Sequence, residues 1–131
     1  MTLDLKSEGV LCPLITPFSD KTVDHTTLTS LINHVRAGGI GGLVPCGTTG
    51  EFASLSLSEH ENIIQATVDN ANGLPVIAGA AGTSEFDVNK KIEIASSAGA
   101  DGVLITLPYF HGANKAEGQS DFFEAIADTA S

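Results

Sequence analysis

The chain repeats one pattern four times: a short apolar run is followed by a longer amphipathic stretch, and each unit takes roughly thirty residues. The apolar runs predict strands over residues 10–16, 41–46, 74–79 and 102–106, and we expect 10–16 to be buried on both faces. Strands that alternate with helices run parallel and are joined by right-handed crossovers. The sequence therefore predicts an α/β fold of four parallel βα units, either in an open doubly wound sheet or in part of a closed barrel.

The amphipathic stretches begin at residues that typically cap helices. Asp24, Ser56 and Ser84 each precede an apolar pattern of helical period, and Glu59 completes a capping box with Ser56. These signals predict helices over residues 24–38, 56–71 and 84–98, and a fourth over 119–130. No low-complexity or linker-like stretch interrupts the series, so we expect one domain over residues 1–131.

The charge balance narrows the range of partners. The chain carries 16 Asp and Glu against 6 Lys and Arg, which argues against nucleic acid and against an anionic membrane surface as ligands. The acids are scattered, as they are in proteins of salt-loving hosts and in ordinary acidic cytosolic proteins alike. No apolar run approaches the ~18 residues of a membrane span. Residues 1–7 lack the apolar core of a signal peptide, so the expected location is the cytoplasm.

Cysteine and histidine spacing predicts no metal site. Cys12 and Cys46 lie in separate apolar segments without a C-x-x-C spacing, which favours two buried thiols over a disulfide. The histidines show no H-E-x-x-H spacing, and we expect each to lie on the surface or on a helix side: His25, His34, His60 and His111. The glycines near residue 47 lack the lysine of a phosphate-binding loop, and no G-x-S-x-G motif is present.

Function in α/β folds collects where strands end, which here means residues 16–18, 46–51, 79–83 and 106–111. The most informative of these segments is Gly47-Thr-Thr-Gly-Glu51. Its two glycines allow a sharp turn that approaches a ligand closely. Two adjacent hydroxyls and exposed amides at such a turn suit a carboxylate or a phosphate.

Taken in order, the motifs resemble those of the dihydrodipicolinate synthase and N-acetylneuraminate lyase family, the pyruvate-dependent class I aldolases. The resemblance covers essentially the whole chain but only the N-terminal half of the family's fold. The landmarks stand in the family's order and spacing: Leu14-Ile-Thr-Pro-Phe18, Val23-Asp24, Gly38-Gly-Ile-Gly-Gly42, Gly47-Thr-Thr-Gly-Glu51, Leu57-Ser-Glu-His60, Pro75-Val-Ile-Ala-Gly79 and Gly99-Ala-Asp-Gly102 through Pro108-Tyr109.

The resemblance implies four of the eight units of a TIM (β/α)8 barrel, in a family that typically forms homotetramers. It also implies a Schiff base between a barrel lysine and pyruvate or a related 2-oxo acid, with no metal or organic cofactor. Thr48 would be the proton-relay hydroxyl, while Thr49 and the Gly50 amide would bind the substrate carboxylate, with Thr16 beside them at the end of the first strand. The alternative is that Thr48 and Thr49 only cap the turn.

Two further aromatic positions follow from the same resemblance. Tyr109 corresponds to a tyrosine of the relay region that family members use at their tight dimer contact. Phe110 stands where synthase members usually carry a second tyrosine, and a phenyl ring cannot pass a proton. Synthase chemistry and the cleavage of 2-keto-3-deoxy sugar acids therefore both remain open.

The family's catalytic lysine would lie beyond residue 131. The lysines present are expected to be solvated surface charges, in particular Lys90, Lys91 and Lys115. We therefore expect the chain alone to be inactive, and a half-barrel with open strand edges to form homo-oligomers. The rival hypothesis is a non-catalytic module that binds carboxylates or assembles with itself.

Overall fold

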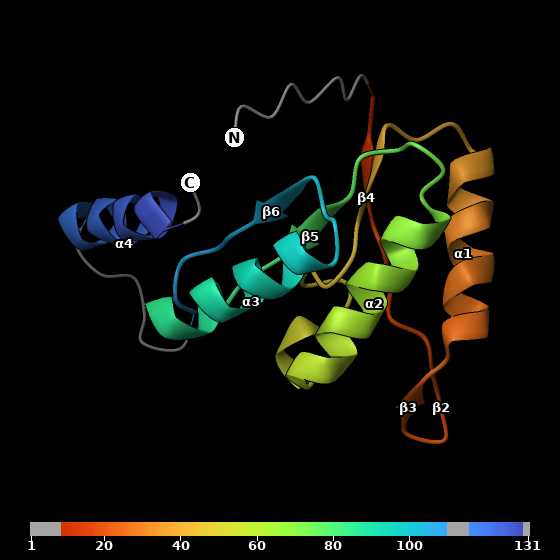
Figure 1. Cartoon of the computed structure of the whole chain (residues 1–131), viewed down its shortest axis with the longest axis horizontal. Coiled ribbons are helices and arrows are strands. Elements are labelled where there is room, and N and C mark those ends of the chain that lie inside the picture. The colour runs from red at the N-terminus through yellow and green to blue at the C-terminus, as the bar shows by residue number, and fades with distance from the viewer. Residues whose placement is uncertain (1–8, 110–115, 130–131) are drawn as a thin grey trace.

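Four parallel strands, each followed by a helix, make up the fold (Figure 1). The computed structural model describes residues 9–109 and 116–129. Strand β1 (Leu11–Pro13) pairs with β4 (Gly42–Val44), and β5 (Ile77–Gly79) pairs with β6 (Gly102–Leu104), both in parallel. A parallel bridge between Leu43 and Val76 joins the two pairs. The strand order β1-β4-β5-β6 confirms the predicted parallel βα units.

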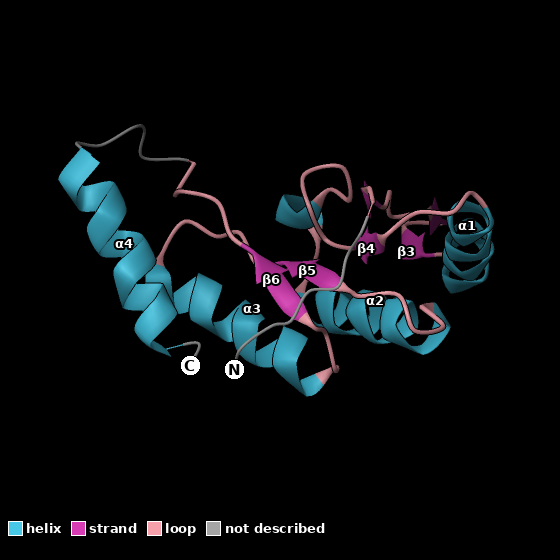
Figure 2. Cartoon of the chain, turned by 90° about the horizontal axis from the view of Figure 1, so that it is seen from above, coloured by secondary structure: helices cyan, strands magenta, loops and turns pink. Residues whose placement is uncertain are grey.

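The first three helices begin where the sequence predicts. Helix α1 (His25–Ala37) is capped by Asp24, α2 (Leu57–Asn70) by the Ser56–Glu59 capping box, and α3 (Glu85–Ser97) by Ser84. The fourth helix, α4 (Ala116–Thr129), is the one expected over 119–130 and begins three residues earlier. Figure 2 shows α2 and α3 along one face of β5 and β6, as in one wall of a barrel.

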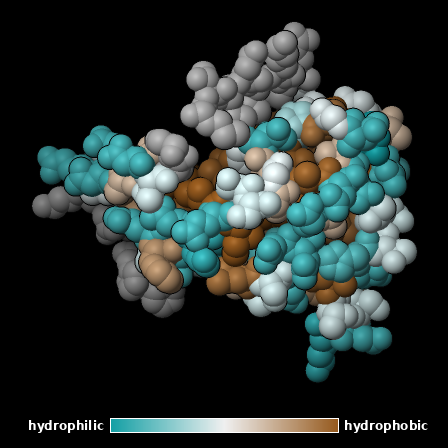
Figure 3. Space-filling view, viewed as in Figure 1, coloured by the Kyte–Doolittle hydropathy of each residue, from teal (hydrophilic) through white to brown (hydrophobic). Residues whose placement is uncertain are grey.

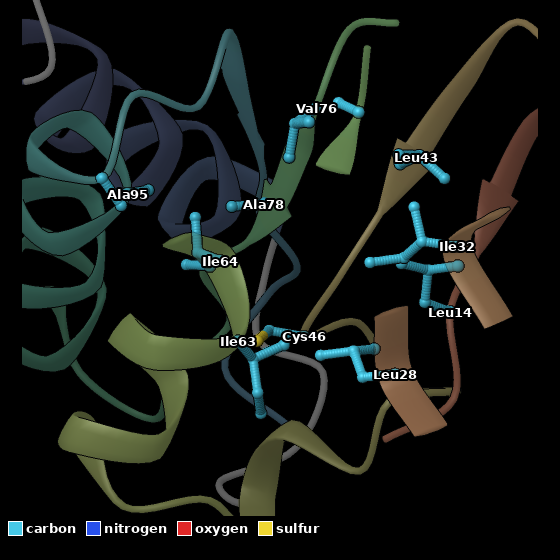
Figure 4. Packing of buried hydrophobic residues seen from close by; sticks show 12 residues of the cluster. Leu14, Leu28, Ile32, Leu43, Cys46, Ile63, Ile64, Val76, Ala78 and Ala95 are labelled. Atoms are coloured by element: carbon cyan, nitrogen blue, oxygen red, sulfur yellow. The ribbon is translucent and has the colours of Figure 1, made fainter. Parts of the chain in front are cut away.

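The core lies between the strands and the helices. Leu28 and Ile32 of α1, and Ile63 and Ile64 of α2, are fully buried with Leu43 of β4 (Figure 4). A second, smaller cluster joins α3 to α4 through Val88, Phe122 and Ile126. No helix in the described ranges is long and apolar enough to cross a membrane.

Two predictions about burial are wrong. Strand residues 10–16 are not buried on both faces: Val10 is 70% exposed and Ile15 55% exposed. They lie next to β1, an outer strand of the four, whereas β4 and β5 in the middle are buried throughout. Cys46 is buried as expected, but Cys12 on β1 is partly exposed, and both thiols are free.

A short antiparallel hairpin follows β1 and was not anticipated. Strands β2 (Phe18–Ser19) and β3 (Thr22–Val23) pair through a turn in which Asp20 and Lys21 both have positive φ. Two left-handed residues match the twist of a two-residue hairpin, and Asn-Gly is the usual sequence for it. Asp-Lys carries no such signal.

Candidate functional site

The segment Gly47–Glu51 forms a tight turn at the carboxyl end of β4. The Gly50 amide donates to the Gly47 carbonyl at 3.0 Å, and the Glu51 amide donates to the Thr48 carbonyl at 3.1 Å. Positive φ falls on Cys46 and Glu51, at 56° and 58°, and on neither glycine. The turn is therefore sharp because of the residues that flank it, which differs from the glycine-driven turn that the sequence predicts.

The turn requires glycine at position 50 because the surrounding backbone leaves no room for a side chain there. A Cβ at this position would lie 3.0 Å from the Leu14 carbonyl oxygen and 3.2 Å from the Cys46 nitrogen. The Thr16 hydroxyl donates to the Gly50 carbonyl at 2.7 Å, and Thr16 is only 5% exposed. Thr16 therefore fastens the turn to the end of β1.

Thr48 and Thr49 stand at the exposed tip of the turn, whereas Gly50 is buried. Within residues 9–109 and 116–129, neither threonine hydroxyl and neither threonine amide has a hydrogen-bond partner. The side chains are therefore not used to cap the turn. Four unpaired donors on two adjacent, exposed residues are groups of the kind that bind anions.

His60 lies on helix α2, which fits the predicted helix position, but its side chain is 1% exposed, so a surface position is wrong. Its Nε2 is 2.8 Å from the Gly79 carbonyl oxygen. Because a carbonyl only accepts, Nε2 carries the proton, and Nδ1 is a buried acceptor without a partner in the described part of the chain. Burial lowers the pKa of His60; the hydrogen bond to Gly79 acts in the opposite direction, and the charge of Lys91 adds to the lowering.

The other described histidines, His25 and His34, are exposed as expected, and His111 lies outside the described residues. Cys46, next to the turn, is an inert buried thiol, since burial raises its pKa to about 12. In the segments that the structure describes, no three His, Cys, Asp or Glu side chains come together as metal ligands would.

The lysines divide into two kinds. Lys90 of α3 is exposed and pairs with Glu93 at 2.9 Å, as expected of a surface charge. Lys91 is not a surface charge, and that prediction is wrong. Its Nζ donates to the Ala81 carbonyl at 2.6 Å, and it lies 5.3 Å from the centre of the Phe52 ring.

Burial lowers the pKa of Lys91, against the opposing charge of Asp87. Lys91 turns inward because it follows Val88 by three residues and precedes Ala95 by four, and both of these residues are fully buried. Lys6, Lys115 and Phe110 lie outside the described residues.

Tyr109 follows β6 and is 54% exposed. Its ring meets Phe52 edge-on, with the ring centres 5.6 Å apart and the planes at 81°. Phe52 begins the 3-10 helix η1 (Phe52–Ser54), directly after the turn. The structure thus brings Tyr109 to the same edge of the sheet as Thr48 and Thr49.

Four parallel βα units whose polar turns gather at the carboxyl ends of the strands define part of a TIM-type (β/α)8 barrel. Residues 6–131 match the model of the Dihydrodipicolinate synthetase family, and the chain belongs to this family. It is 46% identical over 125 residues to the 4-hydroxy-tetrahydrodipicolinate synthase of Rhizobium meliloti, covering 95% of this chain and 42% of that protein.

Solved structures agree with this assignment. Dihydrodipicolinate synthase from Aquifex aeolicus superimposes with a TM-score of 0.86 at 34% identity, covering 92% of this chain and 41% of that one. YagE of E. coli K12, a prophage protein of the same family solved in complex with pyruvate, has a TM-score of 0.85 at 29% identity, covering 92% of this chain and 42% of that one. The chain thus spans about two fifths of the length of the relatives that it matches.

Proposed function

We propose that this chain supplies the carboxylate-binding part of a Schiff-base lyase that acts on pyruvate or a related 2-oxo acid. The observation that carries the proposal is the pair of exposed threonines, Thr48 and Thr49, with unpaired hydroxyls and amides at the end of a buried strand. Short donors at this edge suit an anion without a cation, because N–H and O–H dipoles stabilise negative charge.

Each residue of the turn has its own role in this proposal. Thr49 binds the carboxylate through its hydroxyl and amide, and Thr48 relays a proton. The Gly50 amide already donates within the turn, so a carboxylate would share this donor. Thr16 acts by holding Gly50, because its own hydroxyl is buried and donates to the Gly50 carbonyl. Tyr109 belongs to the relay region and to a contact between subunits.

The covalent step is assigned to the family's barrel lysine, which is expected beyond residue 131. Imine formation needs an unprotonated amine, and a lysine of ordinary pKa is almost fully charged near neutral pH. Lys90 is exposed and ion-paired. Burial lowers the pKa of Lys91, but its Nζ donates to the Ala81 carbonyl and lies over the Phe52 ring, and both contacts favour the ammonium form. We therefore propose that the 131-residue chain alone forms no imine and uses no metal or organic cofactor.

The relatives favour synthase chemistry over sugar-acid cleavage, because the matched relative in Rhizobium meliloti is named a 4-hydroxy-tetrahydrodipicolinate synthase. The rival function is a non-catalytic half-barrel that binds carboxylates or assembles with itself, which the exposed apolar residues of β1 and β6 favour. A cytoplasmic location and a homo-oligomeric state stay predictions.

A pyruvate titration followed by two-dimensional 1H–15N NMR tests the carboxylate site. We expect saturable shifts concentrated on the amides of residues 47–51, and their loss in Thr49→Ala. Thr49→Ser keeps the hydroxyl and should retain most of the affinity. Ser97→Ala, an exposed hydroxyl in the last turn of α3, is the matched control. Shifts elsewhere in the chain, or equal shifts in Thr49→Ala, would refute the site.

A further inference from the structure

Lys91 joins three loops at the carboxyl edge of the sheet. Its ammonium donates to the carbonyl of Ala81, which follows β5. It also lies over the ring of Phe52, which follows the turn after β4. That ring in turn meets Tyr109, which follows β6. A single side chain from α3 thus connects the loops after three successive strands.

Within the described residues, the Lys91 ammonium supplies a positive charge at this edge of an acidic chain. The formal net charge is −10, and Lys90, the neighbour of Lys91, is neutralised by Glu93. Arg36, at the far end of α1, is bonded to Asn33 and to the Asn70 carbonyl. In the described part of the chain, Lys91 has no carboxylate within the 4.0 Å of an ion pair. Its positive charge is therefore not cancelled by direct pairing.

The groups that face Lys91 come from several elements. Asp87 precedes it by one turn on α3 and attracts the ammonium, while Cys46 before the turn and His60 on α2 also feel its charge. Cys46 and His60 are neutral near pH 7, because burial raises the pKa of the thiol and lowers that of the imidazole. An anion bound at Thr49 would be attracted by Lys91 and repelled by the carboxylates of Asp87 and Glu51, so the charge of Lys91 offsets part of this repulsion.

We propose that Lys91 is a positioning residue for the turn Gly47–Glu51, and that its ammonium holds Phe52 and keeps positive charge beside the carboxylate site. The proposal has two parts. The charge term, that Lys91 adds positive charge beside the carboxylate site, rests on the proposed function. The positioning term, that Lys91 holds Phe52 and the turn, does not. A cation over an aromatic face and a charge-assisted hydrogen bond are each strong enough to fix a loop. The stem of the side chain reaches this place because α3 directs positions 88, 91 and 95 inward.

The test compares Lys91→Met, which keeps the length of the stem and removes the charge, with Lys91→Arg, which retains it. Lys90→Met is the control, since it removes an adjacent charge that is exposed and ion-paired. The chain has one tyrosine and no tryptophan, so its intrinsic fluorescence reports on Tyr109 alone. In the absence of pyruvate, we expect Lys91→Met to change the Tyr109 emission and to shift the amides of residues 47–52. Lys90→Met should leave both unchanged.

With pyruvate, Lys91→Met should bind about tenfold more weakly, and Lys91→Arg within about threefold of the original chain. The difference between Lys91→Met and the original chain should shrink as salt is added, because salt screens the lost charge. A change of packing alone would not depend on salt in this way. Phe52→Leu, which removes the ring and keeps the charge, should shift the amides of residues 47–51 and serves where Lys91→Met does not fold.

The positioning term is overturned if the NMR signals of the amides of residues 47–52 do not shift in Lys91→Met. Where Lys91→Met does not fold, the same result in Phe52→Leu overturns it. Wild-type affinity for pyruvate in Lys91→Met overturns the charge term. If the original chain binds no pyruvate, the proposed function fails. The amide shifts and the Tyr109 emission measured without pyruvate still test whether Lys91 positions the turn.

Discussion

The backbone of Cys46 passes so close to Gly79 that a Cβ at Gly79 would overlap the Cys46 carbonyl oxygen and lie 2.8 Å from the Gly47 nitrogen. The Gly79 amide donates to the Pro45 carbonyl at 2.9 Å in the same contact. The end of β5 thus lies directly against the start of the turn that carries Thr48 and Thr49. The position of the candidate site therefore depends on a residue that cannot touch the ligand.

Gly79→Ala should destabilise the chain by about 3 kcal/mol or more, since the clash is with backbone that cannot turn away. Urea unfolding followed by circular dichroism measures this change. Gly118→Ala is the matched control, because a Cβ there meets nothing within 4 Å and α4 is helical at that position. It should be neutral or stabilising, by up to about 1 kcal/mol. Equal stability of the two variants would refute the close approach.

Thr16→Val should cost about 1–3 kcal/mol, because it leaves the buried Gly50 carbonyl without its donor. Thr16→Ser keeps the hydroxyl and should cost less. Thr22→Val removes a similar bond, to the Ser19 carbonyl, at an exposed position and should change stability by no more than about 0.5 kcal/mol. If Thr16→Val behaves like Thr22→Val in urea unfolding, Thr16 does not hold the turn.

Acid should destabilise the chain through His60. Its pKa in the folded state lies below the ordinary 6.5, because burial favours the neutral imidazole. The unfolded chain therefore binds more protons than the folded chain as pH falls through 6.5, and stability is lost over that range. His60→Gln should flatten the pH dependence between about 6.5 and 5. His34→Gln, at an exposed site, should leave it unchanged, and a steep slope that persists in His60→Gln would contradict this origin.

The outer strands should drive self-association. Val10 and Ile15 flank β1, and Leu104 ends β6, with exposed fractions of 70%, 55% and 49%. The space-filling view shows hydrophobic surface near the middle of the molecule, between more hydrophilic parts (Figure 3). We expect oligomers in sedimentation at low micromolar concentration, promoted by salt because the net charge is −10. Leu104→Glu should weaken them more than Phe123→Glu on α4. A folded monomer alone would count against this prediction.

Much of the fold could be predicted because local signals agreed with one another. Asp24, Ser56 and Ser84 cap the helices that they were expected to cap. The hairpin β2–β3 could not be predicted, since Asp20 and Lys21 adopt positive φ without glycine or asparagine. The exposure of strand residues 10–16 was also missed. An apolar run reports hydrophobicity but not which segments lie against it.

The site was predicted less completely. Thr48 and Thr49 lie at the tip of the turn that the motif predicts, and their roles stay predictions, whereas Lys91 and His60 are less exposed than the sequence predicts. For both residues, the spacing to apolar helix positions indicates a buried face. His60 stands three and four residues before Ile63 and Ile64, and Lys91 follows Val88 by three, so each shares the spacing of a buried face. A polar residue type favours the surface, whereas this helical spacing favours a buried face. The partner of each, a backbone carbonyl, cannot be read from a sequence.

Borohydride reduction in the presence of pyruvate, followed by intact mass, tests most directly whether the 131-residue chain lacks an amine that forms an imine with pyruvate. A family member that carries its barrel lysine, treated in parallel, should gain one reduced pyruvate. We expect the mass of this chain to stay unchanged, in the original sequence and in Lys91→Met alike. A stoichiometric adduct on one lysine would contradict the account. Its absence in Lys91→Met would identify Lys91 as the amine.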